Sequence, residues 1–273
     1  MSASPARPGT VYLVGAGPGA PALLTLRAAR LLERADVVFH DALVHPEVLA
    51  LAARAERVAV GKRCGRLSTA QRFINKRLVD AAQRHAVVVR LKGGDPMLFG
   101  RAQEELDALA QAGIAVEVVP GVSAAFAASA AVQRSLTLRG TSRSVAFVTP
   151  AVGEGENAHD WAGPAAAADT LVLYMASRRA HEVSQGLVAA GVPGDRPAVI
   201  VENASLPGER VVASRVADLA RDAGSLGSGP ALVLVGEALA AVASARPTVP
   251  AAASARSTPS GATRPPEPAL RRA

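Results

Sequence analysis

Two glycine-rich loops each follow a stretch with the composition of a buried strand. The first reads GAGPGA over residues 15–20, after the apolar run 11–14, and the second reads GGDP over residues 93–96, after the run 87–91. Glycine lets a ligand approach the backbone closely, and the carboxylate of Asp95 can accept hydrogen bonds from hydroxyl or ammonium groups. The two loops therefore predict a site for a neutral or cationic ligand at the end of a sheet.

The first loop also matches the spacing G-x-G-x-x-A of a dinucleotide-binding turn. Asp36 or Asp41 lies about 20 residues further on, where such folds hold a ribose. Pro18 and Pro21 oppose this interpretation, because each proline removes a backbone donor that a pyrophosphate would need. A NAD-dependent Rossmann oxidoreductase is therefore one alternative, and a tight turn with a purely structural role is another.

A charged cluster of Arg101, Glu104 and Glu105 follows the second loop at helical spacing. Positions i+3 and i+4 share a helix face with position i, so we expect both carboxylates to face the guanidinium. A surface ion pair is the simplest interpretation. Because the cluster begins at the mouth of the loop, a guanidinium held in this way could also present two donors to a carboxylate of a substrate.

The elements that carry these residues alternate between β-branched runs and helical stretches rich in alanine and leucine. This pattern is typical of strands joined by crossover helices, so the sequence predicts an α/β fold with a parallel sheet in its first half. The predicted strands there are 11–14, 36–39, 57–60, 87–91 and 115–119, and the predicted helices are 21–34, 46–54, 69–84 and 100–112. Ligands are expected beyond the carboxyl ends of these strands.

The second half begins after Pro120 and Gly121. Its predicted helices are 123–133, 178–190 and 214–222, and its predicted strands are 144–149, 170–174, 198–202, 209–214 and 231–235. The later strands follow one another too closely for full crossovers, which predicts a mixed sheet. We expect two domains, over 9–120 and 121–242, between a flexible N-terminus (1–8) and a disordered tail (243–273) rich in Ala, Pro, Ser and Arg.

Composition argues against several classes of protein. The 273 residues are 49% hydrophobic and only 3% aromatic, which suits helices packed closely on sheets and not a surface that stacks on bases. More than half of the net charge of +7 comes from the tail, so charge does not indicate nucleic acid. One cysteine, Cys64, allows no intrachain disulfide, and no apolar run has the length of a membrane span. These features predict a cytoplasmic protein without nucleic-acid or membrane partners.

Several segments occur together and in order, among them VGAGPGAPALL, VGKRCG, VVVRLKGGDPMLFGRAQEE, VVPGVSAA and VIVENAS. In this combination, nearly the whole chain between its two ends resembles the uroporphyrinogen-III C-methyltransferases of the tetrapyrrole methylase superfamily. The resemblance implies two α/β domains with S-adenosyl-L-methionine in the cleft between them, and a homodimer. It also implies methylation of uroporphyrinogen III, an anionic tetrapyrrole, at C2 and C7, giving precorrin-2 for sirohaem or cobalamin synthesis without a metal.

The resemblance also implies a role for individual residues. Asp41 matches a proton acceptor and Lys62 a proton donor, for which a turn carboxylate and a solvated lysine are the simpler alternatives. Arg101, with Glu104 beside it, is included among the catalytic residues, and Arg101 and Arg139 are implied to bind the substrate. The residues implied for cofactor binding are Pro18, Gly93, Gly94, Asp95, Leu98, Ser123, Ala124, Met175 and Ala204.

The chain departs from the family pattern at His40, Leu67 and Leu138. Here HDALV, GRLST and SLTLRG stand where the family usually has YDALV, GRHST and PLTHRG. Leu67 and Leu138 remove polar groups that bear on substrate fit, so the cofactor is more firmly implied than the substrate. A cobalt-precorrin methyltransferase of the same superfamily and a cofactor-binding module without catalysis are further alternatives.

Overall fold

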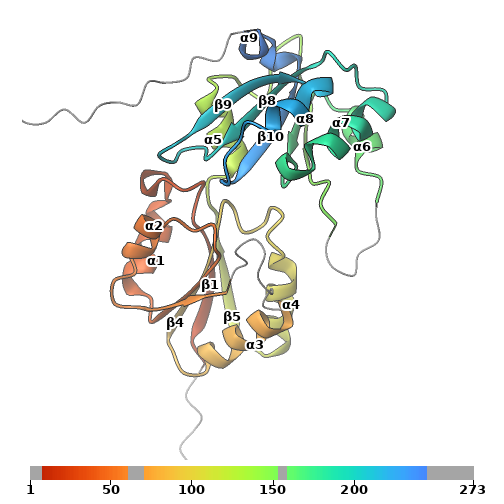
Figure 1. Ribbon diagram of the computed structural model, residues 1–273. Coiled ribbons are helices and arrows are strands. Elements are labelled where there is room, and N and C mark those ends of the chain that lie inside the picture. The colour runs from red at the N-terminus through yellow and green to blue at the C-terminus, as the bar shows by residue number, and fades with distance from the viewer. Residues whose placement is uncertain (1–7, 61–70, 153–158, 245–273) are drawn as a thin grey trace, which may run out of the picture.

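The structure, a computed structural model, describes residues 8–60, 71–152 and 159–244. It contains two five-stranded sheets, one from each half of the chain, and each sheet lies between layers of helices (Figure 1). The predicted α/β fold is therefore confirmed. Lys62, Cys64 and Leu67 lie outside the described residues.

The first sheet is entirely parallel, as the sequence predicts, and its strand order is β3-β2-β4-β1-β5. Its strands are β1 (Thr10–Gly15), β2 (Val37–His40), β3 (Glu56–Ala59), β4 (Val87–Lys92) and β5 (Ala115–Val119). The order differs from the 3-2-1-4-5-6 order of a dinucleotide-binding Rossmann fold. The topology therefore argues against the NAD-dependent oxidoreductase.

Helices cover both faces of this sheet (Figure 1). Side chains alternate along a strand, so Val11 and Leu13 of β1 pack on one face, whereas Val14 packs on the other. The first face is covered by α3 (Gln71–Ala82) and α4 (Ala102–Gln111), and the second by α1 (Leu26–Arg34) and α2 (Pro46–Ala50). Burial on both faces explains the nearly continuous apolar runs of the central strands.

Two predicted helices of this half are shorter than expected. The prediction 21–34 is wrong at its start, because Pro21–Leu23 form a 3₁₀ turn and Thr25 is extended. The Oγ1 atom of Thr25 accepts a hydrogen bond from the N–H of Ala28 at 3.1 Å, so Thr25 caps a helix that begins at Leu26. The prediction 46–54 extends too far, since α2 ends at Ala50.

The second sheet has the order β6-β7-β10-β8-β9 and is mixed, as predicted. Only β6 and β7 run parallel, and each of the other neighbouring pairs is antiparallel. Its strands are β6 (Val145–Val148), β7 (Thr170–Leu173), β8 (Pro197–Glu202), β9 (Arg210–Arg215) and β10 (Ala231–Gly236). The predicted boundary at residue 120 falls between the two sheets, and we propose that it separates two domains.

The helices of the second half also form two layers. One face of the sheet carries α5 (Ala124–Ala131) and α9 (Ala240–Ala243), and the other carries α6 (Ala162–Ala166), α7 (Ala180–Ala189) and α8 (Leu219–Ala223). Helix α6 was not predicted from the sequence, because it spans only five residues and contains glycine and proline. Helices α7 and α8 begin later than predicted because a 3₁₀ turn precedes each of them.

Within the described part of the chain, no helix combines the length and the apolar character that crossing a membrane requires.

Candidate functional site

The two glycine-rich loops are hydrogen-bonded to each other. The N–H of Gly94 donates to the carbonyl of Gly17 at 2.8 Å, and the N–H of Gly17 donates to the carbonyl of Gly94 at 3.2 Å. Both residues have a φ of +69°, which favours glycine. A Cβ at Gly15 would lie 2.6 Å from the backbone of Gly121 and 2.7 Å from the carbonyl oxygen of Gly94. The loops after β1, β4 and β5 therefore form one closely packed unit.

The carboxylate of Asp95 ties this unit together. Its Oδ2 accepts a hydrogen bond from the N–H of Gly121 at 2.9 Å, and its Oδ1 accepts one from the N–H of Met97 at 2.8 Å. Each of these bonds satisfies a main-chain donor, and the bond from Gly121 fixes the loop after β4 to the loop after β5. A contact between Asp95 and a cofactor stays a prediction.

Both glycines of the second loop leave room for a further atom, near the start of α5. Among the described residues, a Cβ at Gly94 would have the backbone nitrogen of Ala124 as its one neighbour within 4 Å, at 3.9 Å, and a Cβ at Gly93 would have the Cβ of Leu43, at 3.4 Å. A ligand could therefore approach the main chain here without meeting a side chain of the loop. Three of the residues predicted for cofactor binding, Gly93, Gly94 and Ala124, border this space.

Ser123 connects the start of α5 to the second sheet. Its Oγ accepts a hydrogen bond from the N–H of Ala125 at 3.3 Å and lies 2.6 Å from the hydroxyl of Tyr174, to which it is hydrogen-bonded. Burial raises the pKa of Tyr174, against the opposing effect of this hydrogen bond. The hydroxyl of Ser123 thus caps the helix and fixes the residue that precedes Met175.

Loops of the second sheet lie directly against loops of the first. The rings of Tyr174, after β7, and Phe99, after β4, have centroids 5.1 Å apart. The N–H of Ala20, after β1, donates to the Oγ of Ser205, after β8, at 3.2 Å. These contacts bring the segments that hold Met175 and Ala204 to the edge of the first sheet where the glycine-rich loops meet. Met175 is exposed there, and Ala204 is half-buried.

Strained backbone angles are concentrated where these loops of the two sheets meet, a region that we call the junction. Positive φ angles are uncommon outside glycine and cluster at functional sites. Among the described residues, five of the six non-glycine residues with such angles follow β4, β7 or β8: Phe99, Arg101, Met175, Asn203 and Ser205. The concentration of strained residues supports the junction as the candidate site.

Arg101 and Glu104 form the surface ion pair that the sequence predicts. The Nε and Nη2 atoms of Arg101 donate to the two carboxylate oxygens of Glu104 at 2.6 and 2.7 Å. The hydrogen bond from Arg101 lowers the pKa of Glu104. The expectation that Glu105 also faces Arg101 is wrong. Helix α4 begins at Ala102, and Glu105 lies on its buried face with Ala102 and Leu109.

Glu105 instead belongs to a buried ion cluster, which we define as Asp41, Arg90, Lys92 and Glu105. Oε1 of Glu105 accepts a hydrogen bond from Nε of Arg90 at 2.9 Å, and Oε2 accepts one from Nζ of Lys92 at 3.1 Å. Nη2 of Arg90 donates to Oδ1 of Asp41 at 2.6 Å. Exposed fractions are 2% for Arg90, 3% for Lys92 and 0% for Glu105, whereas the side chain of Asp41 is 28% exposed.

The two buried cations respond differently to this environment. Burial disfavours the charge of both. Around Arg90 the nearby carboxylates of Asp41 and Glu105 outweigh burial and raise its pKa. Around Lys92, burial and repulsion from Arg90 outweigh the attraction of Glu105 and lower its pKa.

Arg90, Lys92 and the buried role of Glu105 were not predicted from the sequence. One signal could have found them: Arg90 and Lys92 stand two positions apart in an apolar strand, so both side chains lie on the same buried face. Buried cations require partners of opposite charge, and Glu105 is the carboxylate on the buried face of α4.

The remaining predicted residues are Pro18, Leu98, Arg139 and Lys62. Pro18, in the first glycine-rich loop, and Leu98, two residues after the second, are both half-buried. Arg139 is exposed in a turn that hydrogen bonds between Leu138 and Ser142 close. Lys62, the predicted proton donor, lies outside the described residues.

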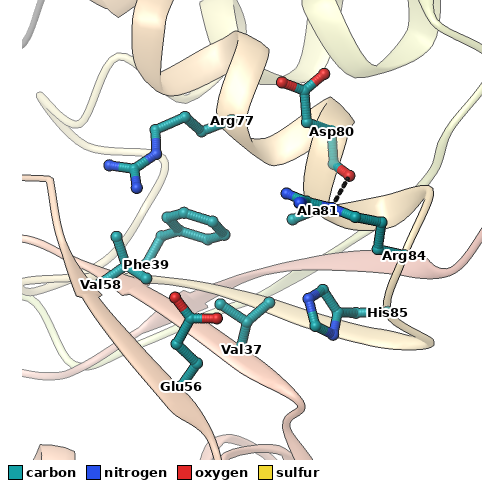
Figure 2. Close-up of a pocket in the computed structure, with 9 residues that line it drawn as sticks. All are labelled: Val37, Phe39, Glu56, Val58, Arg77, Asp80, Ala81, Arg84 and His85. Carbon is teal, nitrogen blue, oxygen red and sulfur yellow. Dashed lines mark hydrogen bonds between the residues drawn. The ribbon is translucent and has the colours of Figure 1, made fainter.

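A small cavity lies at the amino ends of strands of the first sheet (Figure 2). Its volume is about 150 Å³, and its lining includes Val37 and Glu56, the first residues of β2 and β3, and His85, which precedes β4. Arg77 projects over the ring of Phe39, with 5.8 Å between the guanidinium carbon and the ring centroid. The candidate site follows the carboxyl ends of the strands, so this cavity is separate from it.

Comparison with known proteins identifies the family. The sequence profile of the tetrapyrrole (corrin/porphyrin) methylases matches residues 10–220. The chain belongs to this family. Among its curated relatives, a uroporphyrinogen-III C-methyltransferase from Pseudomonas aeruginosa is 45% identical over 230 residues, which cover 84% of this chain and 94% of that one. A siroheme synthase from Zymomonas mobilis is 43% identical over 84% of this chain, which spans about half (49%) of the synthase's length.

Solved structures of the tetrapyrrole methylase family share the fold. A uroporphyrin-III C-methyl transferase from Thermus thermophilus, complexed with S-adenyl homocysteine, is 42% identical with a TM-score of 0.76; the match covers 85% of this chain and 100% of that one. A cobalt precorrin-4 methyltransferase is 30% identical with a TM-score of 0.73, over 84% of this chain and 95% of that one. The resemblance seen in the sequence is thus confirmed at the level of family and fold.

Proposed function

We propose that this protein is an S-adenosyl-L-methionine-dependent methyltransferase that methylates uroporphyrinogen III at C2 and C7 and forms precorrin-2. The observation that carries the proposal is the 45% identity to a uroporphyrinogen-III C-methyltransferase over 94% of that enzyme's length. The relatives named siroheme synthase support the same chemistry in the part of their length that this chain spans. Cobalt-precorrin methylation is the weaker alternative, because that neighbour is only 30% identical.

The junction between the two sheets fits the cofactor. No side chain of the loop covers the backbone at Gly93 and Gly94, beside Ala124, so main-chain groups can contact a ligand that carries both apolar and polar parts. The Thermus neighbour in complex with S-adenyl homocysteine supports this cofactor class. When bound, S-adenosyl-L-methionine supplies a methyl group on a positively charged sulfur. In our proposal Pro18, Asp95, Leu98, Ser123, Met175 and Ala204 complete the site.

The substrate carries carboxylates around a macrocycle, and exposed guanidinium groups suit them. Arg101 is 59% exposed and is held by both oxygens of Glu104, so its orientation is fixed before a substrate arrives. We assign Arg101 and Arg139 to substrate binding. Alignment of the pyrrole carbon with the methyl group is then the main task of the protein.

A proton must leave the substrate when a pyrrole carbon gains a methyl group. We assign its removal to Asp41, whose carboxylate lies at the end of β2 and is partly exposed. Lys62 is proposed as the proton donor on the basis of the resemblance alone. The proposal also includes a homodimer in the cytoplasm and requires no metal.

One assay tests the proposed function. Pure protein is incubated without oxygen with uroporphyrinogen III and S-adenosyl-L-methionine, and the product mass is measured. Two added methyl groups are expected. A single methyl group or none would contradict the proposal. Calorimetric titration with S-adenosyl homocysteine and with NAD provides the control, because the proposal requires binding of the first compound only.

A further inference from the structure

The buried ion cluster has one member that reaches the surface. Arg90, Lys92 and Glu105 are almost fully buried, whereas the carboxylate of Asp41 is partly exposed at the carboxyl end of β2. The cluster contains two cations and two carboxylates, so its formal charge is balanced. Asp41 is therefore the member of the cluster that a bound substrate can contact directly.

The guanidinium of Arg90 is fixed in three directions. Nε donates to Glu105 of α4 at 2.9 Å, Nη1 donates to the carbonyl of Leu91 at 3.2 Å, and Nη2 donates to Asp41 at 2.6 Å. A guanidinium is planar and rigid, so two anchored nitrogens determine where the third points. The position of Nη2, and with it the position of Oδ1 of Asp41, is thus set by β4 and α4.

We propose that Arg90 is a positioning residue for Asp41. Arg90 holds Oδ1, and it leaves Oδ2, which has no hydrogen-bond partner among the described residues, to receive the proton of the substrate. Glu105 orients Arg90 through Oε1, and Lys92 donates a hydrogen bond to the other carboxylate oxygen, Oε2. The inference rests on the proposed function, since it takes Asp41 to be the proton acceptor.

The contacts of Glu105 allow a positioning role of Arg90 to be distinguished from a role in folding alone. Without Arg90, Glu105 keeps the Nζ of Lys92 at 3.1 Å and the Nε2 of Gln71 at 3.1 Å. Asp41, by contrast, loses the ion pair that Arg90 supplies. The substitution Arg90→Met leaves a paired carboxylate and ammonium inside and a partly hydrated carboxylate outside. We therefore expect this variant to fold.

A double-mutant cycle tests the proposal, with Arg90→Met, Asp41→Asn and the double variant. The kcat and KM for uroporphyrinogen III are measured, together with the Kd for S-adenosyl homocysteine. Arg90→Met should lower kcat about 10- to 100-fold, as expected for loss of a charge-assisted hydrogen bond, and should change the Kd less than about twofold. In the Asp41→Asn background the same change should lower kcat less than about threefold. Independent, multiplicative losses would overturn the proposal.

Lys92→Met is the matched control. It removes the other buried cation from the same strand face and from the same carboxylate, but it leaves the contact between Arg90 and Asp41 in place. Its kcat should stay within about threefold of the wild-type value. An equal loss in Lys92→Met and Arg90→Met would show that Arg90 only supports the fold. If Arg90→Met does not fold, Arg90→Lys replaces it in the cycle, because it keeps the charge and loses the planar fork.

Failure of the proposed function would be distinguishable from failure of this inference. A wild-type protein that forms no dimethylated product would contradict the function. Positioning is then decided by a crystal structure of Arg90→Met, or of Arg90→Lys, in which the carboxylate of Asp41 should leave its wild-type position. A carboxylate that stays in place would overturn the positioning role whatever the protein methylates.

Discussion

Two ionic regions meet at the first turn of α4, and their environments are opposite. The pair Arg101–Glu104 is about half exposed, with exposed side-chain fractions of 59% and 48%. The cluster around Glu105, one residue further along the helix, is almost completely buried. Exposed pairs contribute little stability, so Arg101 can bind a substrate without harm to the fold. Removing Glu105, the one carboxylate of the cluster that is fully buried, leaves buried cations without enough partners, so this region contributes much more to stability than the exposed pair does.

The largest expected effect is that of Glu105→Gln on stability. This change leaves Arg90 and Lys92 buried with Asp41 as the one remaining carboxylate of the cluster, and it should lower the free energy of unfolding by about 3–5 kcal/mol. Urea denaturation followed by circular dichroism measures the loss. Glu104→Gln, with the same chemical change one residue away, is the control and should lose less than about 1 kcal/mol. Equal losses would remove the distinction between the two regions.

Arg101→Ala should reduce catalysis and spare the cofactor. We expect kcat/KM for uroporphyrinogen III to fall about 100-fold, because a bidentate contact fixes both the charge and the orientation of a carboxylate. The Kd for S-adenosyl homocysteine, measured by calorimetry, should change less than about threefold. Arg101→Lys keeps the charge and should recover part of the loss. A parallel loss of cofactor binding would contradict the assignment of Arg101 to the substrate.

Lys92 should make stability depend on pH in the alkaline range. Burial, with repulsion from Arg90, lowers the pKa of Lys92 below 10.5, so the unfolded chain binds this proton more tightly than the folded chain does. Stability attributable to Lys92 therefore rises as the pH increases from the lowered pKa towards 10.5. The difference in unfolding free energy between wild type and Lys92→Met, measured by urea denaturation, should grow in favour of wild type over this range. A constant difference would contradict the prediction.

The smallest effect is expected for Glu104 in acid. The hydrogen bond from Arg101 lowers the pKa of Glu104, so its contribution to stability is present above pH 4.5 and is lost as the pH falls through the lowered pKa. Because the pair is exposed, wild type and Glu104→Gln should differ by less than about 1 kcal/mol at neutral pH. Their melting curves should coincide in strong acid. A larger difference in acid than at neutral pH would show that the pair does not behave as a surface ion pair.

The fold could be predicted from the sequence to a large extent because its strands are short apolar runs bounded by turn residues. Each predicted strand overlaps an observed one, and the parallel and mixed sheets follow from the spacing of the runs. Helix starts were harder to predict, because they depend on caps such as Thr25 and on 3₁₀ turns that resemble helices in composition. Helix α6 is too short to show a helical period.

The candidate site was predictable where local chemistry defines it. Gly17 and Gly94 stand out because turns and close approaches need glycine, although their mutual pairing depends on the order of the strands. The contact of Arg90 with Glu105 was not predicted, because it depends on how α4 packs against β4. Spacing alone predicts that Glu105 faces Arg101. In the structure α4 begins at Ala102, and Glu105 lies on its buried face.

The reciprocal hydrogen bonds between Gly17 and Gly94 have a dynamic consequence. Each glycine gives its amide proton to the carbonyl of the other, so neither amide can reach solvent while the two loops remain joined. Their hydrogens should therefore exchange with deuterium at a common rate, set by a single opening event that separates the loops after β1 and β4. A bound cofactor that bridges these loops should slow both exchanges by the same factor.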